Sequence, residues 1–305
     1  MPLQHRYRPK SLKTFRGSSS TIKSLQSVLN REDTPHAFLI TGNSGTGKTT
    51  LARIIAKMLG CDPADFTEYD SADFRGIDMV RQIRQSMNFM PSSGSCRVWL
   101  LDECHQLTKD AQEALLKMLE EARSHVYFIL ATTDPQKLKI TVKRRCAEFN
   151  LSPLTDAEMT TALQKVITRE GKQVPQEIIE KIVDQSTGSA GIALSILDKI
   201  IDLDEADMEE ASEQESIKQN EVIDLCRALM SRSDWGLVAN LVANIEAEPE
   251  SIRRMVLGYM TSVALKSPKQ MDKIYSILDA FRDDFYTTGK AGLILACYEA
   301  STVFG

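Results

Sequence analysis

Long apolar runs are missing from the sequence. No apolar run approaches the roughly 20 residues that a membrane-spanning helix needs, so we expect no contact with a membrane. The first ten residues, MPLQHRYRPK, have no apolar core, so we expect no secretory signal there. Cysteines stand at 61, 96, 104, 146, 226 and 297 and include no C-x-x-C pair, which argues against zinc and against a disulfide framework. We therefore expect free thiols and a reducing cytoplasm.

An excess of basic residues is also missing. The net charge is -5 at pH 7, which excludes a protein that coats nucleic acid through its overall charge, although a local basic surface stays open. The composition, 42% hydrophobic and 26% charged with only 6% aromatic residues, is typical of a globular protein. A chain of 305 residues is expected to fold as two or three domains.

A glycine-rich stretch, TGNSGTGKTT, follows the apolar run AFLI and matches G-x-x-x-x-G-K-[ST]. Glycines let many backbone N–H groups face a phosphate, so the pattern predicts a nucleotide phosphate loop before a helix. Lys48 would contact the β- and γ-phosphates, and the Thr49 hydroxyl would bind Mg²⁺. A glycine-rich turn that binds nothing is the alternative. The predicted nucleotide-binding residues here are Gly42, Asn43, Ser44, Gly45, Thr46, Gly47, Lys48, Thr49 and Thr50.

A second motif, VWLLDECH, is an apolar run that ends in two acids. Such runs are typical of parallel strands covered on both faces, and ligands bind at the carboxyl ends of these strands. Asp102 would hold Mg²⁺ through its waters, and Glu103 would polarise the attacking water as general base. The alternative is an acidic helix start. A third run, HVYFILATTD, ends in Thr132 and Thr133, where a hydroxyl either orients water or only completes a strand.

The order of elements predicts an α/β class with helical additions. Strands alternate with helices from 36 to about 152, which indicates a parallel sheet. Residues 156–201 form helical patterns with Thr155 as N-cap, and 217–304 predict a four- or five-helix bundle. The acidic stretch 202–215 is an expected linker or solvated helix, with a functional acidic tail as alternative. We therefore predict three domains, 1–154, 155–205 and 216–305.

Four ordered motifs resemble AAA+ clamp-loader ATPases, namely the motor subunits of replication factor C, of bacterial polymerase III gamma/tau and of phage clamp loaders. They are RYRPKSL, DSADFRGIDMVRQ, LLDECHQLTKDAQEALLKMLEE and ILATTDPQKLKITVKRRCAEF. The resemblance is dense over 6–200 and weaker over 216–305. It implies an α/β P-loop AAA+ domain with a parallel sheet, a small helical lid and a C-terminal helical collar for oligomerisation.

The same resemblance assigns further roles by position. Tyr7 and Arg8 lie in the box that borders the adenine of ATP, and Thr133 takes the first sensor role. Arg145 becomes an arginine finger that acts on the ATP of the neighbouring subunit, where its charge would stabilise the transition state. A solvated basic turn is the alternative for Arg145. The implied cofactors are ATP and Mg²⁺.

DNA contacts are implied in the segment before and within the next helix. Arg75, Gly76 and Ile77 would start a helix whose amides face a phosphate, and Arg81 and Arg84 lie three residues apart on it. In the family such helices follow the backbone of primer–template DNA without reading its sequence. An ordinary exposed arginine face is the alternative.

The implied function is an ATPase motor subunit that opens a sliding clamp and loads it on primer–template DNA. Its partners would be the clamp, the DNA and other loader subunits, with several copies of this chain in a heteropentamer, in a bacterial or phage-infected cell. Three features depart from the family: no cysteine-rich zinc module, Arg144 in the S-R-C box, and Gly191 where the second sensor has arginine. A structural subunit that binds but poorly hydrolyses ATP, and a helicase or helicase loader suggested by D-E-C-H, remain alternatives.

Overall fold

The computed structural model describes two compact units of the chain, Met1–Glu205 and Ala206–Gly305. The described residues are 1–71, 76–204, 207–208, 221–231, 233–266, 270–286 and 288–302.

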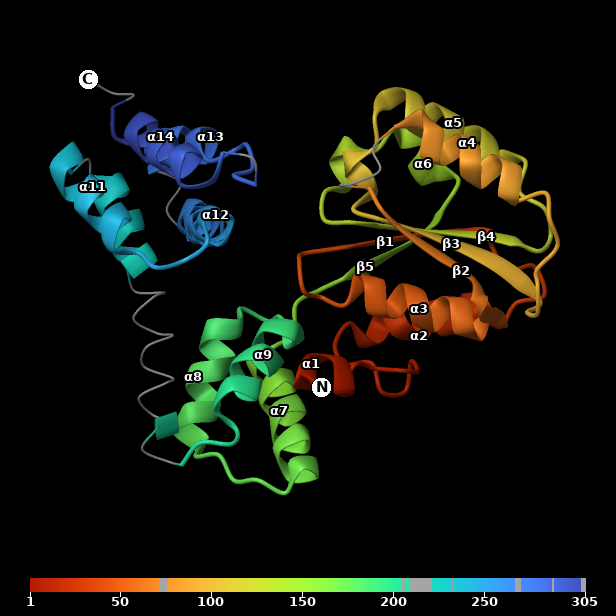
Figure 1. Cartoon of the computed structure of the whole chain (residues 1–305), viewed down its shortest axis with the longest axis horizontal. Coiled ribbons are helices and arrows are strands. Elements are labelled where there is room, and N and C mark those ends of the chain that lie inside the picture. The colour runs from red at the N-terminus through yellow and green to blue at the C-terminus, as the bar shows by residue number, and fades with distance from the viewer. Residues whose placement is uncertain are drawn as a thin grey trace. The chain divides into compact units, whose positions relative to one another are not determined.

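Five parallel strands form the sheet of the first unit (Figure 1). Their order across the sheet is β2-β3-β4-β1-β5, so the apolar strands predicted from the sequence occupy its centre. All five carboxyl ends open at one edge because the strands are parallel, and this edge carries the predicted nucleotide motifs. The strands are β1 (Ala37–Gly42), β2 (Cys61–Asp70), β3 (Cys96–Asp102), β4 (Val126–Thr132) and β5 (Ala147–Leu151).

Helices cover both faces of this sheet (Figure 1). On one face, apolar side chains of α4, α5 and α6 pack against Phe128 and Leu101, and on the other, those of α2 and α3 pack against Phe38. The two buried layers explain why the central strands are apolar on both sides, and they confirm the predicted α/β class. The helices are α2 (Ser19–Leu29), α3 (Lys48–Met58), α4 (Ile77–Ser86), α5 (Lys109–Glu120) and α6 (Ile140–Arg144).

The edge strand β2 was not predicted because its sequence, CDPADFTEYD, shows neither a continuous apolar run nor a clean alternation. Pro63 is tolerated because β2 pairs with β3 alone, and proline is confined to such edges. Asp65 is buried within β2 and accepts backbone hydrogen bonds from Ser92, Ser93 and Gly94 at 2.8–3.3 Å. This carboxylate fixes the loop that leads into β3.

Three further helices of the first unit lie in the segment for which the sequence predicts a helical lid, and they are called the lid below. They are α7 (Asp156–Glu170), α8 (Gln176–Ser186) and α9 (Ala190–Ile200). Thr155 and Glu158 form a reciprocal capping box at the start of α7, and Gly171 ends the helix with φ 67°. The short helix α1 (Leu3–Arg6) packs on α9, with Leu3 buried and its N–H 3.1 Å from Asp198 Oδ1.

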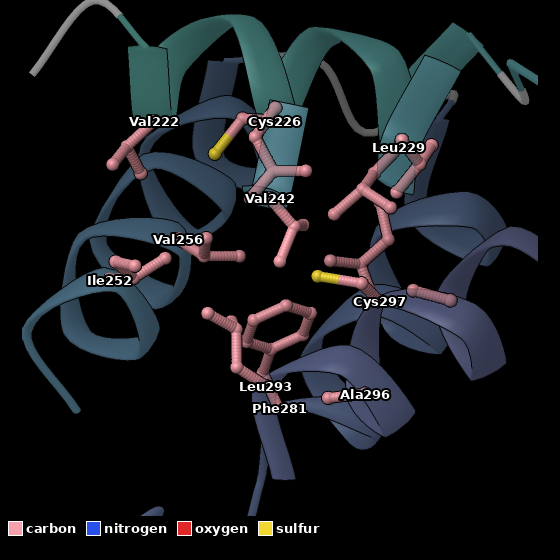
Figure 2. Close-up of a cluster of buried hydrophobic side chains, with 14 of the residues drawn as sticks. Val222, Cys226, Leu229, Val242, Ile252, Val256, Phe281, Leu293, Ala296 and Cys297 are labelled. Carbon is pink, nitrogen blue, oxygen red and sulfur yellow. The ribbon is translucent and has the colours of Figure 1, made fainter. Parts of the chain in front are cut away.

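The second unit is helical, as the sequence predicts. Its described helices are one over 221–231, α11 (Trp235–Asn244), α12 (Pro249–Lys266), α13 (Met271–Ala280) and α14 (Gly289–Thr302). Side chains from different helices meet in one core, where Val242, Val256, Phe281 and Cys297 point toward one another (Figure 2). Within the described residues of both units, no helix has the length and apolarity to cross a membrane.

Candidate nucleotide-binding site

The glycine-rich loop connects β1 to α3 with backbone conformations that glycine favours. Gly45 and Gly47 have φ values of 76° and 94°, in the left-handed region that other residues rarely adopt. The loop leads directly into the N-terminus of α3, which is the positive end of that helix. This conformation is compatible with the predicted phosphate-binding loop, whose role stays a prediction.

Lys48, the first residue of α3, is buried and its ammonium group is bound to neutral acceptors. Its Nζ donates to the carbonyl oxygens of Gly42 at 3.0 Å and Asn43 at 3.1 Å. Burial lowers the pKa of Lys48, while the charges of Glu103 and Asp102 raise it. No carboxylate among the described residues forms an ion pair with Lys48, so an arriving anion would find a desolvated cation.

Thr49 and Asp102 bring two oxygen ligands together at the edge of the sheet. The Thr49 hydroxyl donates to Asp102 Oδ2 at 2.6 Å, and the N–H of Glu103 donates to Asp102 Oδ1 at 3.0 Å. Burial raises the pKa of Asp102, and the bonds from Thr49 and Glu103 oppose this. A hydroxyl beside a carboxylate is a donor set that suits Mg²⁺, which binds hard oxygen ligands and keeps several waters.

Glu103 is held beside this pair in a left-handed backbone conformation, with φ 46°. Its Oε2 accepts hydrogen bonds from the Thr133 hydroxyl at 3.1 Å and the Thr133 N–H at 3.3 Å, and His105 Nδ1 lies 3.2 Å away. Burial raises the pKa of Glu103, but the His105 contact, the Lys48 charge and the Thr133 bond outweigh it and lower the pKa to about 2. The carboxylate is therefore ionised at neutral pH.

A cavity of about 700 Å³ lies over these groups. Ser44 to Thr50, Asp102 and Glu103 line one side, and Tyr7 and Arg8 of the N-terminal segment line another. Arg8 Nε donates to the Thr50 hydroxyl at 2.8 Å, and the Tyr7 hydroxyl donates to Glu170 of α7. The N-terminal segment thus contacts both α3 and α7, and that Tyr7 and Arg8 border a bound base stays a prediction.

The lid closes the cavity through the start of α9. Gly188, Ala190 and Gly191 line it, and a Cβ on Gly45 would lie 2.1 Å from Ser189 Oγ. The first turn of α9 therefore packs directly on the phosphate loop. Gly191 brings no cation to this wall, whereas Lys165 and Arg169 of α7 do line the cavity.

Arg145 lies away from the cavity and is exposed, with Nη2 2.8 Å from Glu120 Oε1. It does not line the site of its own chain, among the residues that the structure describes. This placement is compatible with the predicted action on a neighbouring subunit, which stays a prediction.

Of the predicted DNA-binding residues, those that the structure describes lie at the start of α4 and along its exposed face. Gly76 is its N-cap and Ile77 its first residue, while Arg81 forms an ion pair with Asp78 at 3.1 Å. Arg84 forms an ion pair with Glu121 at 2.9 Å. Arg75 lies outside the described residues. That this face binds DNA stays a prediction.

The residues at the site that escaped prediction include His105, Gln106, Lys165, Arg169, Glu170 and Ser189. His105 and Gln106 belong to the short helix η1 (Cys104–Gln106) directly after the acidic motif. Their position in D-E-C-H-Q, directly after the two acids, is the sequence feature that could have indicated them. Glu170 and Ser189 meet Tyr7 and Gly45 across more than 140 residues of chain, and no local pattern reports such contacts.

Fold and site together define an AAA+ P-loop domain followed by a helical lid. The solved structures agree on the fold. Thermotoga maritima RuvB, titled a Holliday junction branch migration motor, superposes with a TM-score of 0.58 at 21% identity, covering 71% of this chain and 78% of that one. A variant of RuvB from the same organism gives a TM-score of 0.59, also at 21% identity and with the same coverage of both chains.

Particular relatives emerge from the sequence comparisons. The family model described as DNA polymerase III, delta subunit, matches residues 64–155. The chain is 34% identical to DNA polymerase III subunit tau of Bacillus subtilis over 216 residues, covering 64% of this chain and 38% of that protein. It is 32% identical to subunit gamma of Buchnera aphidicola over 222 residues, covering 66% and 61%. The chain thus spans less than two thirds of these relatives, and the matches confirm the predicted resemblance to clamp-loader AAA+ subunits.

Proposed function

We propose that the chain is the ATPase motor subunit of a loader that opens a sliding clamp and places it on primer–template DNA. The convergence of Lys48, the Thr49–Asp102 pair and Glu103 at one cavity carries the proposal. Lys48 binds the β- and γ-phosphates of ATP, and Glu103 orients the attacking water. Thr49 and Asp102 would hold Mg²⁺, which neutralises phosphate charge when bound.

The active site is completed by a second subunit in this proposal. Arg145 is exposed and its ion-pair partner, Glu120, is a surface carboxylate, so its guanidinium is available to a neighbour's γ-phosphate. Several copies of the chain within a heteropentamer, in the cytoplasm of a bacterial or phage-infected cell, follow from the likeness to DNA polymerase III subunits.

DNA is held by its backbone in this proposal. The N-terminal amides of α4 start at Ile77, and Arg81 and Arg84 lie on the same exposed face. Their present ion pairs are exposed and contribute little, so a phosphate can replace Asp78 or Glu121 at small cost. Binding would fall with rising salt and would be insensitive to sequence.

Steady-state ATP hydrolysis tests the motor assignment, measured for the chain co-purified with its clamp and companion subunits, with and without primer–template DNA. We expect stimulation by DNA and clamp in the wild type, and hydrolysis near background in Glu103→Gln with ATP binding retained. Arg145→Ala should leave nucleotide affinity nearly intact and lower hydrolysis by about 10³-fold or more. Equal rates in wild type and Glu103→Gln would refute the motor assignment.

A second candidate is a structural subunit that binds ATP, hardly hydrolyses it and supplies Arg145 to a neighbour. Gly191 favours this candidate, because the lid helix α9 brings no cation to the cavity at that position. The same assay separates the two: the structural subunit predicts hydrolysis by the assembly that is insensitive to Glu103→Gln and sensitive to Arg145→Ala.

A further inference from the structure

We propose that His105 is a positioning residue for Glu103, and that Gln106 fixes the ring tautomer that His105 needs for this role. The inference rests on the proposed ATP hydrolysis and adds two residues to its machinery. Neither residue is expected to touch the nucleotide, because neither lines the cavity among the described residues.

The His105 ring is buried between the two strand ends that carry the site. Its side chain is 9% exposed, and Nδ1 lies 3.1 Å from the Thr132 hydroxyl oxygen and 3.2 Å from Glu103 Oε2. An ionised carboxylate oxygen can only accept hydrogen bonds. An unprotonated Nδ1 would place its lone pair against a lone pair of Glu103 Oε2, so Nδ1 must carry the proton.

Gln106 supplies the reason why the proton stays on Nδ1. Its Nε2 amide lies 3.1 Å from the Nε2 nitrogen of His105, and an amide nitrogen can only donate. The ring nitrogen at this end is therefore the acceptor, and the neutral ring has its single N–H at Nδ1. This hydrogen is shared between the Thr132 hydroxyl and Glu103 Oε2.

The two carboxylate oxygens of Glu103 therefore differ in their number of hydrogen-bond partners. Oε2 accepts from the Thr133 N–H, the Thr133 hydroxyl and His105, whereas Oε1 has no hydrogen-bond partner among the described residues. Since the side chain lines the cavity and is 33% exposed, one oxygen is anchored in the wall and the other is left for water. A left-handed φ of 46° at a non-glycine residue persists only where surrounding contacts fix it.

Hydrolysis and nucleotide affinity of substituted full-length chains test the positioning role. We expect His105→Ala to lower kcat by about 10–100-fold, because the carboxylate loses a fixed orientation, while the Kd for a fluorescent ATP analogue changes less than about twofold. His105→Asn restores a side-chain N–H near the Nδ1 position and should recover part of kcat. His125→Ala is the matched control, because His125 is equally buried but bonds the Phe89 carbonyl oxygen, away from the site.

The tautomer can be tested without any hydrolysis. The sequence has only four histidines, so ¹⁵N-histidine spectra of the full chain are simple, and loss of a signal in His105→Asn assigns the ring. We expect a protonated Nδ1 and an unprotonated Nε2, and we expect Gln106→Leu to shift population toward the other tautomer and to lower kcat.

Several outcomes would overturn the inference, and they differ from those that overturn the ATPase assignment. A His105→Ala variant with wild-type or raised kcat, no recovery in His105→Asn, or a protonated Nε2 in the wild type each contradicts the positioning role. Measuring Glu103→Gln in parallel distinguishes failure of this inference from failure of the proposed function. If Glu103→Gln is inactive while His105→Ala is fully active, only the inference fails, and if Glu103→Gln is fully active, the proposed function fails.

Discussion

Replacing Glu250 by alanine should destabilise the second unit more than any surface substitution in it. The Glu250 side chain is 7% exposed at the start of α12, and it accepts two hydrogen bonds from Arg253, at 2.7 and 2.9 Å. It also accepts from Arg254 at 3.2 Å and from the Phe285 N–H at 3.0 Å, which ties α12 to the segment after α13.

The expected magnitude follows from what the substitution leaves behind. Arg253 is only 14% exposed and would keep a desolvated charge without its carboxylate, and the Phe285 N–H would lose its acceptor. Removing one partner of a buried ion pair costs about 3–5 kcal/mol, and we take about 3 kcal/mol because Arg254 is half exposed and can be hydrated.

Fluorescence of Trp235 during urea unfolding measures this loss. The sequence has two tryptophans, so a Trp99→Phe background leaves Trp235, which lies edge-on to Tyr298 in the second unit, as the reporter. The urea midpoint should fall by about 2 M for a unit of this size. Asp224→Ala is the control, since its pair with Arg227 is exposed on both sides and should matter by less than about 0.5 kcal/mol. A midpoint shift no larger than that of the control would refute the reasoning.

The pH dependence of the same unfolding transition tests whether the ionised Glu250 carboxylate stabilises the second unit. Burial raises the pKa of Glu250, but the hydrogen bonds from Arg253 and Phe285 outweigh it and the pKa is lowered overall. A lowered folded-state pKa contributes stability that is complete above the unfolded pKa of about 4.3 and is lost as the pH falls through the folded pKa. Glu250→Gln should remove this part of the acid sensitivity.

Three further substitutions probe the first unit. Gly45→Ala should weaken nucleotide binding by about tenfold or more in calorimetric titration, because its Cβ would lie 2.1 Å from Ser189 Oγ and its φ is 76°. Gly171→Ala, with φ 67° and nothing within 4 Å of the added Cβ, should cost about 1 kcal/mol of stability and leave binding unchanged. Asp65→Ala should lower stability by about 2–4 kcal/mol, read from Trp99 fluorescence, because three backbone N–H groups lose a buried acceptor and Arg97 loses its ion-pair partner. A loss below about 1 kcal/mol would show that water replaces the Asp65 carboxylate.

The central strands and the phosphate loop could be predicted because their physical requirements act on neighbouring residues. A strand buried on both faces must be apolar throughout, and a loop that turns amides inward must contain glycine at fixed spacing. The cap at Thr155 was predictable for the same reason, since the capping box pairs residues three apart.

The edge strand and the walls of the cavity could not be predicted, because their causes lie elsewhere in the chain. Strand β2 exists through its pairing with β3 and through Asp65, which binds amides nearly thirty residues later. The bond of Arg8 to Thr50 and that of Tyr7 to Glu170 join segments that are remote in sequence. Family resemblance indicated that Tyr7 and Arg8 matter, but their partners come from the structure.

The packing of α1 on α9 has a consequence for synthesis of the chain on the ribosome. The Leu3 N–H donates to Asp198 across a separation of 195 residues, so α1 is synthesised long before the helix on which it packs. At a translation rate of roughly 5–20 residues per second, it must wait about 10–40 s for its binding surface. A nascent chain therefore cannot close the wall built by Tyr7 until the lid has emerged, which delays nucleotide capture until most of the first unit has been translated.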